Sequence, residues 1–106
     1  MLYLGIGDIC TQDFTHFLKK GQMIGEERKK YPNKYPNRLN LEDGRLAEFF
    51  LGKKGMMRNF IIYETEDPQQ LLNLQTFWLP EIRYTFIPIF HVTDIKKSWE
   101  EKWGAT

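Results

Sequence analysis

The sequence has very few of the residues that build disulfides and metal sites. Among its 106 residues there are one cysteine, Cys10, and two histidines, His16 and His91. A single cysteine excludes an intrachain disulfide and every cysteine-based metal motif. Two histidines are too few to indicate a metal site, and the GIG near the start lacks the third glycine of a phosphate-binding loop. The sequence therefore identifies no metal-binding or cofactor-binding residue, and any cofactor is unknown.

An excess of charge of one sign and long apolar runs are also missing. The chain has 15 basic and 14 acidic side chains, a net charge of +1. This balance gives no long-range attraction to nucleic acid or to an anionic membrane. No apolar run approaches the roughly 20 residues that cross a bilayer. The opening MLYLGIGDI is short and lacks the basic flank of a signal peptide. We therefore expect a cytoplasmic protein without a membrane or nucleic-acid partner.

Apolar and aromatic residues, in contrast, are plentiful, at 42% and 15% of the chain. This composition and length are typical of one packed globular domain that needs no disulfide or metal. We expect a single domain over residues 1–106, with a core at 1–92 and a helical tail at 93–106. The aromatic rings are interpreted mainly as core, with a cavity or a subunit interface as the alternative.

Six segments of regular hydrophobic spacing make up the predicted core. Period-two alternation or short apolar runs predict strands at residues 2–7, 46–52, 57–64 and 85–92. Helical spacing predicts one helix after a cap at Thr11 and another after Asp67, where Pro68 suits the first helical position. A short amphipathic helix in the tail is predicted from the spacing of three apolar residues: Ile95, Trp99 and Trp103.

The predicted order, strand–helix–strand–strand–helix–strand, is that of a ferredoxin-like α+β fold. Such a fold is an antiparallel βαββαβ sheet with its helices on one face, here with an added C-terminal helix. Right-handed crossovers place the strands in the order fourth, first, third, second, so the last strand lies at an edge. Pro88, in the middle of that strand, is acceptable at an edge because no ladder donor is needed there.

Strand parity divides the predicted sheet into two faces. The face predicted to lie under the helices carries Leu2, Leu4, Ile6, Ala47, Phe49 and Leu51. The face predicted to be free of helices carries Tyr3, Gly5, Gly7, Glu48, Phe50, Asn59, Tyr63, Ile87, Ile89 and His91. That second set is too apolar to leave in water, so two copies placed face to face would cover it and enclose a cavity. The sequence thus predicts a homodimer through the sheet face.

The second half of the chain, YETEDPQQLLNLQTFWLPEIRYTFIPIF, resembles a family of small bacterial and archaeal proteins catalogued as a domain of unknown function. The resemblance lies in an acidic strand end, an Asp-Pro helix start, a tryptophan on the helix and a proline in the closing strand: Glu64, Asp67–Pro68, Trp78 and Pro88. That family is assigned to the dimeric α/β-barrel group. The resemblance implies this fold and a dimer, and it carries no catalytic residues.

The predicted site is the cavity between the two sheets. His91 is its titratable member, with Tyr63 as the second candidate for acid–base chemistry. Tyr3, Glu48 and Phe50 are the candidate ligand-binding residues, and Gly5 and Gly7 would leave room for the ligand. A surface or interface role for His91 is the simpler alternative. The function predicted in this way is binding or conversion of a small apolar ligand.

Two other functions remain open at this point. One is assembly or regulation without catalysis. The other is RNA binding, because RNA-recognition motifs share the element order and RNFIIYET matches their octamer at Arg58 and Phe60. The match fails at Ile61 and Ile62, and acidic residues flank the basic YPNKYPNR loop. We therefore expect no RNA binding. The indoles of the tail are expected to be buried against the body or against a partner subunit.

Overall fold

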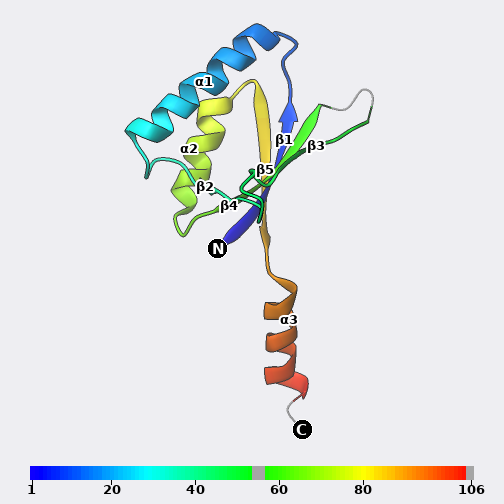
Figure 1. The fold of residues 1–106 in the computed structure, drawn as a ribbon. Coiled ribbons are helices and arrows are strands. Elements are labelled where there is room, and N and C mark those ends of the chain that lie inside the picture. Colours follow the sequence, from blue (N-terminus) through cyan, green and yellow to red (C-terminus); the bar gives the residue numbers. More distant parts are fainter. Residues whose placement is uncertain (54–56, 105–106) are drawn as a thin grey trace.

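The computed structural model describes residues 1–53 and 57–104. It shows an α+β domain with a five-stranded antiparallel sheet and three helices (Figure 1). In chain order the elements are β1 (Leu2–Ile9), α1 (Phe14–Lys30), β2 (Asn37–Arg38), β3 (Glu48–Phe50), β4 (Arg58–Glu64), α2 (Pro68–Trp78), β5 (Ile82–Ile89) and α3 (Val92–Trp99), followed by a π-helical turn (Glu100–Gly104). The α+β class and the antiparallel sheet are confirmed.

The sheet is built on β1, which pairs with β4 on one side and with β5 on the other. Two short strands, β2 and β3, pair with the remaining edge of β4 at different places along it. The strand β2 lies in the predicted YPN loop and was not expected from the sequence. Helices α1 and α2 both lie on one side of the sheet (Figure 1).

The helix starts follow local capping chemistry, with one correction. Asp67 caps α2 by accepting a hydrogen bond from the Gln69 backbone nitrogen at 2.9 Å, and Pro68 occupies the first helical position, as predicted. Helix α1 is capped by Asp13, which accepts from the His16 nitrogen at 3.1 Å. The prediction of Thr11 as this cap is wrong, because its hydroxyl accepts instead from the Asp13 nitrogen.

The predicted assignment of faces is wrong for β1, β3 and β4. By register Gly5 lies beside Ile61 and Phe86, and Gly7 lies beside Asn59 and Tyr84. These residues form the side of the sheet under the helices, where Tyr63 is 1% exposed in the main apolar cluster. The reason is steric: a Cβ at Gly5 would lie 2.5 Å from Tyr63 Cε2, and one at Gly7 would lie 2.2 Å from Asn59 Oδ1. The glycines thus make room for the side chains of Tyr63 and Asn59 instead of for a ligand, and they do so on the face opposite to the predicted one.

The face without helices, which we call the open face, is therefore largely aliphatic. Leu2, Leu4 and Ile6 share this face with Ile87 and Ile89, whose placement was predicted correctly. Across β4 and β3 it continues through Phe60, Ile62 and Phe49. Phe49 is 54% exposed and Ile87 is 42% exposed. No helix in the described part of the chain covers these side chains (Figure 1).

Residues 90–104, which we call the C-terminal arm, extend away from the rest of the chain. The last predicted strand ends at Ile89, and His91 caps α3 instead of continuing the strand. The arm continues in the direction of β5, so the molecule measures 60 × 36 × 27 Å (Figure 1). Trp99 and Trp103 are 61% and 67% exposed. The expectation that the indoles are buried on the body is wrong within one chain, and burial on a partner stays a prediction.

The steric role of Gly5 yields the first testable prediction. We expect Gly5→Ala to lower the free energy of unfolding by about 1–3 kcal/mol, because the new methyl group meets the fully buried Tyr63 ring. Gly25→Ala is the matched control, since nothing lies within 4 Å of its Cβ position in α1. It should raise the free energy of unfolding by about 0.5–1 kcal/mol. Urea denaturation measures both, and an unchanged stability of Gly5→Ala would contradict the packing described here.

Candidate functional site

A cavity of about 210 Å³ lies between the sheet and the two helices that cover it. We call it the site cavity. Side chains from six elements line it: Phe17, Gly21, Ile24 and Arg28 of α1, Arg38 of β2, Glu48 of β3, Asn59, Ile61 and Tyr63 of β4, Leu74 and Trp78 of α2, and Ile82 and Tyr84 of β5. Its walls are thus mainly aromatic and aliphatic, and a small number of polar groups point into it.

The helix side of the site cavity follows from spacing along α1. Phe17, Gly21, Ile24 and Arg28 recur every three or four residues, so they share one helix face. Gly21 allows the Trp78 ring to approach, with a ring atom 3.8 Å from its Cβ position. The rings of Phe17 and Trp78 are 5.2 Å apart and tilted. The glycine and the two rings therefore hold α1 and α2 together above the cavity.

One end of the site cavity is cationic. Arg28 is anchored there by an Nη1 hydrogen bond to the Pro36 carbonyl oxygen at 2.8 Å and by packing over the Tyr35 ring. Burial lowers the pKa of Arg28, and the nearby charge of Arg38 lowers this pKa further. Among residues 1–53 and 57–104, neither arginine forms an ion pair with a carboxylate. Their remaining donors suit a carboxylate or phosphate group.

The other polar feature of the site cavity is Asn59. Its residue is 8% exposed, and its Oδ1 atom has no hydrogen-bond partner in the described part of the chain. Burying a polar atom without a hydrogen-bond partner lowers the stability of the fold by on the order of 1–3 kcal/mol. Such atoms are therefore rare in native proteins and call for an explanation. A ligand that donates a hydrogen bond to this oxygen would supply the missing partner.

A second, outer hollow of about 430 Å³ adjoins the site cavity. The two share Phe17, Glu48 and Asn59, and the outer hollow is completed by Ile9, Leu46, Phe49 and Phe50. Phe17, Glu48 and Asn59 therefore border both the site cavity and the outer hollow.

The structure brings together three of the five site residues predicted from the sequence. Tyr63 and Glu48 line the site cavity, and Phe50 lines the outer hollow. Tyr3 lies level with Tyr63 on β1, at the end of the sheet, and lines neither. His91 lies in the C-terminal arm, where its Nδ1 accepts a hydrogen bond from the Thr93 backbone nitrogen at 3.2 Å. The expected contact of His91 with Tyr63 on one sheet face is therefore wrong.

The tyrosines of the site cavity are donors of hydrogen bonds. Burial raises the pKa of Tyr63 far above its ordinary value, and the neighbouring Tyr84 raises it further. Burial also raises the pKa of Tyr84, to about 12. Both phenols thus keep their protons at neutral pH. A phenol in this state can donate a hydrogen bond but is not a base at neutral pH.

Sequence reasoning missed the polar residues that distinguish this cavity, namely Arg28, Arg38 and Asn59. Two of them carry a signal in the sequence. Arg28 continues the apolar stripe of α1, and Asn59 interrupts the apolar run of β4 at a buried position. Arg38 carries no such signal, because it lies in a loop sequence whose short strand was not predicted.

The YPN loop places its two tyrosines differently. Tyr35 is 2% exposed, and its hydroxyl donates a hydrogen bond to Glu27. Tyr31 is 48% exposed, with the ammonium groups of Lys30 and Lys34 above its ring at 5.4 and 5.7 Å. Tyr35 is therefore part of the core, whereas Tyr31 lies at the surface. That the loop does not bind RNA stays a prediction.

A separate charged cluster joins α1 to the start of β5. The Glu81 carboxylate, with a side chain 9% exposed, accepts from Lys20 Nζ at 2.5 Å and lies 2.8 Å from His16 Nε2. Both Glu81 oxygens have a partner within the protein, so we interpret the cluster as one that stabilises the fold. Among the residues that the structure describes, no group of three or more histidine, cysteine or acidic side chains is arranged to hold a metal ion.

The Glu81 cluster gives a pH-dependent prediction. The hydrogen bond from Lys20, followed by that from His16, lowers the pKa of Glu81 from 4.5 to about 2. A depressed folded-state pKa stabilises the fold above the unfolded-state value, and this contribution is lost as pH falls from about 4.5 towards 2. Glu81→Gln should therefore destabilise at pH 6 and differ less and less from wild type below pH 4.5. Thermal unfolding across this range measures it, with the exposed Glu101→Gln as control; parallel curves for Glu81→Gln and wild type would contradict it.

Comparison with known proteins adds no family to these observations. No protein-family model matches the chain. No curated protein and no solved structure is significantly similar to it. No helix in the described residues is long and apolar enough to cross a membrane.

Proposed function

We propose that this protein binds a small carboxylic acid that carries a hydrogen-bond donor at its far end, and that it does so in the site cavity. The observation that carries the proposal is the buried Asn59 side chain: its Oδ1 atom lacks a hydrogen-bond partner among the described residues, and the residue lines the site cavity. An acceptor of this kind is satisfied by a hydroxyl or amino group of a ligand. It is not satisfied by a hydrocarbon.

The acid group is placed by the two arginines. Tyr63 and Asn59 are four residues apart on β4, which separates their Cα atoms by about 13 Å along the strand. Arg28 and Arg38 lie at the Tyr63 end, since Arg38 pairs directly with Tyr63 in the sheet. A carboxylate at the arginines and a donor at Asn59 thus define an elongated ligand whose two ends are both polar.

The part of the proposed ligand between its two polar ends is apolar and small. Between the polar ends the cavity wall is formed by Ile24, Ile61, Leu74, Trp78 and Tyr84. The volume of about 210 Å³ is below the range of roughly 300–1,000 Å³ that holds drug-sized ligands. A single ring or a short chain between the two polar groups fits these walls best.

The proposal keeps the small-ligand function expected from the sequence and moves its site from between two sheets to beneath the helices. Guanidinium groups, an amide and protonated phenols hold and orient a ligand. None of these groups takes a proton from it at neutral pH. Glu48 is the one carboxylate among the lining residues. We propose binding and assign no reaction. Assembly without a ligand is the second candidate, and it is favoured by the open face of the sheet.

Ligand binding is tested with three probes that differ by one group each. 4-Hydroxycinnamate has both polar ends, cinnamate lacks the hydroxyl, and methyl 4-hydroxycinnamate lacks the charge. We expect NMR titration of the full chain to show shifts at Asn59 and Arg38 with 4-hydroxycinnamate. Each of the other two probes should bind at least about tenfold more weakly.

Two variants and a control identify the polar groups. Asn59→Leu should remove the preference for the hydroxyl probe without lowering the melting temperature, because it deletes a buried oxygen that has no partner. Arg38→Met should remove the preference for the acid over the ester. Arg45→Met is the control, since Arg45 pairs with Asp43 at an exposed site outside the cavity. Equal affinity of Asn59→Leu and wild type for all three probes would refute the proposal.

We also propose that the chain forms a homodimer through its open face. Leu4, Ile6, Phe60, Ile62 and Ile87 make this face apolar, and large uncovered apolar surfaces mark interfaces. We propose in addition that the fold is ferredoxin-like and that the dimer is a dimeric α/β barrel. Both proposals are supported by β5, β1 and β4 lying side by side with α1 and α2 on one face.

The homodimer is tested by a matched pair of lysine substitutions. Ile87→Lys changes an exposed residue of the open face, so it should yield a monomer with an intact fold. Leu72→Lys changes an even more exposed residue on α2 and should leave the dimer unchanged. Light scattering at micromolar concentration measures the mass of each. A monomeric wild-type protein would contradict the proposal.

A further inference from the structure

We propose that the C-terminal arm of one copy packs its apolar face onto the open face of a second copy. This inference rests on the homodimer proposed above and is independent of ligand binding. It names the element of the second copy that covers the open face, namely the helix of its C-terminal arm. The argument starts from the arm, continues with the open face and ends with the area that the two bury.

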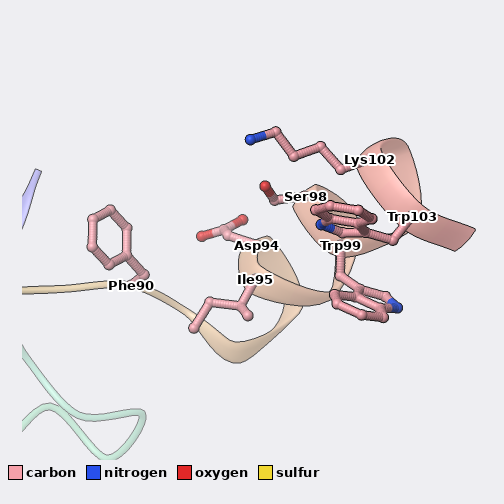
Figure 2. Close-up of a pocket in the computed structure, with 7 residues that line it drawn as sticks. All are labelled: Phe90, Asp94, Ile95, Ser98, Trp99, Lys102 and Trp103. Carbon is pink, nitrogen blue, oxygen red and sulfur yellow. The ribbon is translucent and has the colours of Figure 1, made fainter.

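The arm has a helix with an apolar side that no other element of residues 1–53 and 57–104 covers. Phe90, Ile95, Trp99 and Trp103 are each at least 60% exposed. They line a hollow of about 470 Å³, with Asp94, Ser98 and Lys102 along its rim (Figure 2). The rings of Trp99 and Trp103 are 6.0 Å apart. A helix this short is marginal in water by itself, so its formation depends on a surface against which the apolar side packs.

The direction of the arm points to a second copy as that surface. Its helix is capped by His91, two residues after β5 ends, and it continues away from the sheet (Figure 1). The arm therefore extends away from the open face of its own chain. The arm leaves the end of the edge strand β5, and so it can reach the open face of another copy.

The open face suits a single helix. Its three central strands, spaced at about 4.8 Å, form an apolar strip that matches the roughly 10 Å diameter of one helix. The strip carries Leu4 and Ile6 on β1 between Ile62 on β4 and Ile87 on β5. Branched aliphatic side chains of this kind pack well against indole rings.

The area and the charge both permit a stable dimer. Four large side chains, each with on the order of 100 Å² exposed, meet an equal area of sheet, and two reciprocal contacts bury about 1,600 Å² in total. That is the size of a standard specific interface. The arm holds three acidic and three basic residues, Asp94, Glu100, Glu101, Lys96, Lys97 and Lys102, and the whole chain has a net charge of +1. The two copies therefore do not repel each other.

The first experiment measures dimer affinity by sedimentation of the full chain. We expect the double variant Trp99→Ala/Trp103→Ala to dimerise at least about 100-fold more weakly than wild type, since it removes both indoles. The matched control is Lys97→Ala/Glu101→Ala, which changes the opposite side of the same helix and keeps the net charge. It should leave the dimer affinity unchanged, and circular dichroism checks that both variants keep the α+β body folded.

The second experiment shows which molecule the arm contacts. A nitroxide is attached to Lys97→Cys in a Cys10→Ser background, so that Cys10, which is exposed, is not labelled. This spin-labelled chain is mixed with isotope-labelled chain that has no nitroxide. We expect broadening of the amide signals of Leu4, Ile6 and Ile62 in the isotope-labelled copy, because the arm of the spin-labelled copy lies over them.

Each outcome separates this inference from the homodimer. Equal dimer affinity of the tryptophan variant and wild type would show that the sheets meet without the arms, which overturns the inference and leaves the homodimer intact. A dimer in which these signals broaden only when the nitroxide is attached to the isotope-labelled chain itself would show that each arm folds back on its own sheet, and this too overturns the inference. A monomeric wild-type protein would overturn both proposals.

Discussion

The contact between the Tyr63 ring and the backbone of Gly5 is the constraint on which the rest of the structure depends. The ring occupies the space that a side chain at Gly5 would fill, and it packs edge-on against Tyr84 and Phe86 with centroids 6.4 and 6.0 Å away. Because a strand alternates its side chains, placing this one ring under the helices places every other residue of β4. The pairing of β4 with β1, and of β1 with β5, then determines which side chains of these two strands lie under the helices.

A second glycine on the same face of β1, Gly7, has the same role next to the candidate site. Gly7 leaves room for Asn59 as Gly5 does for Tyr63, but an amide has polar atoms that a tyrosine ring lacks. Most buried polar atoms find partners within the protein, and Asn59 Oδ1 does not. Arginine side chains at the other end of the same cavity add donors without a carboxylate partner. A domain of this size retains such groups at the expense of stability, which is a pattern typical of functional sites.

The consequence on the other side of the sheet is an aliphatic surface without a helix. Once the large rings lie beneath α1 and α2, the residues that remain for the open face are branched or straight aliphatic side chains, which gain little from exposure to water. The arm presents the complementary surface, because it is a helix with indoles on one side and no body beneath it. The proposed ligand site and the proposed dimer surface thus lie on opposite faces of one sheet.

The sequence by itself determined the element types and the clearest boundaries. The α+β class, the Asp67–Pro68 helix start and the amphipathic tail all follow from local spacing and capping chemistry, which act within a few residues. Alternation also showed that each strand has two faces. It did not show which face the helices cover, because both faces of β1 and β4 are apolar enough to be buried. That choice was decided by tertiary packing, where only the glycine side of β1 accommodates Tyr63 and Asn59. The meeting of Arg28, Arg38 and Asn59 in one cavity was likewise decided by the tertiary structure, because these residues come from three elements whose contacts span long stretches of chain.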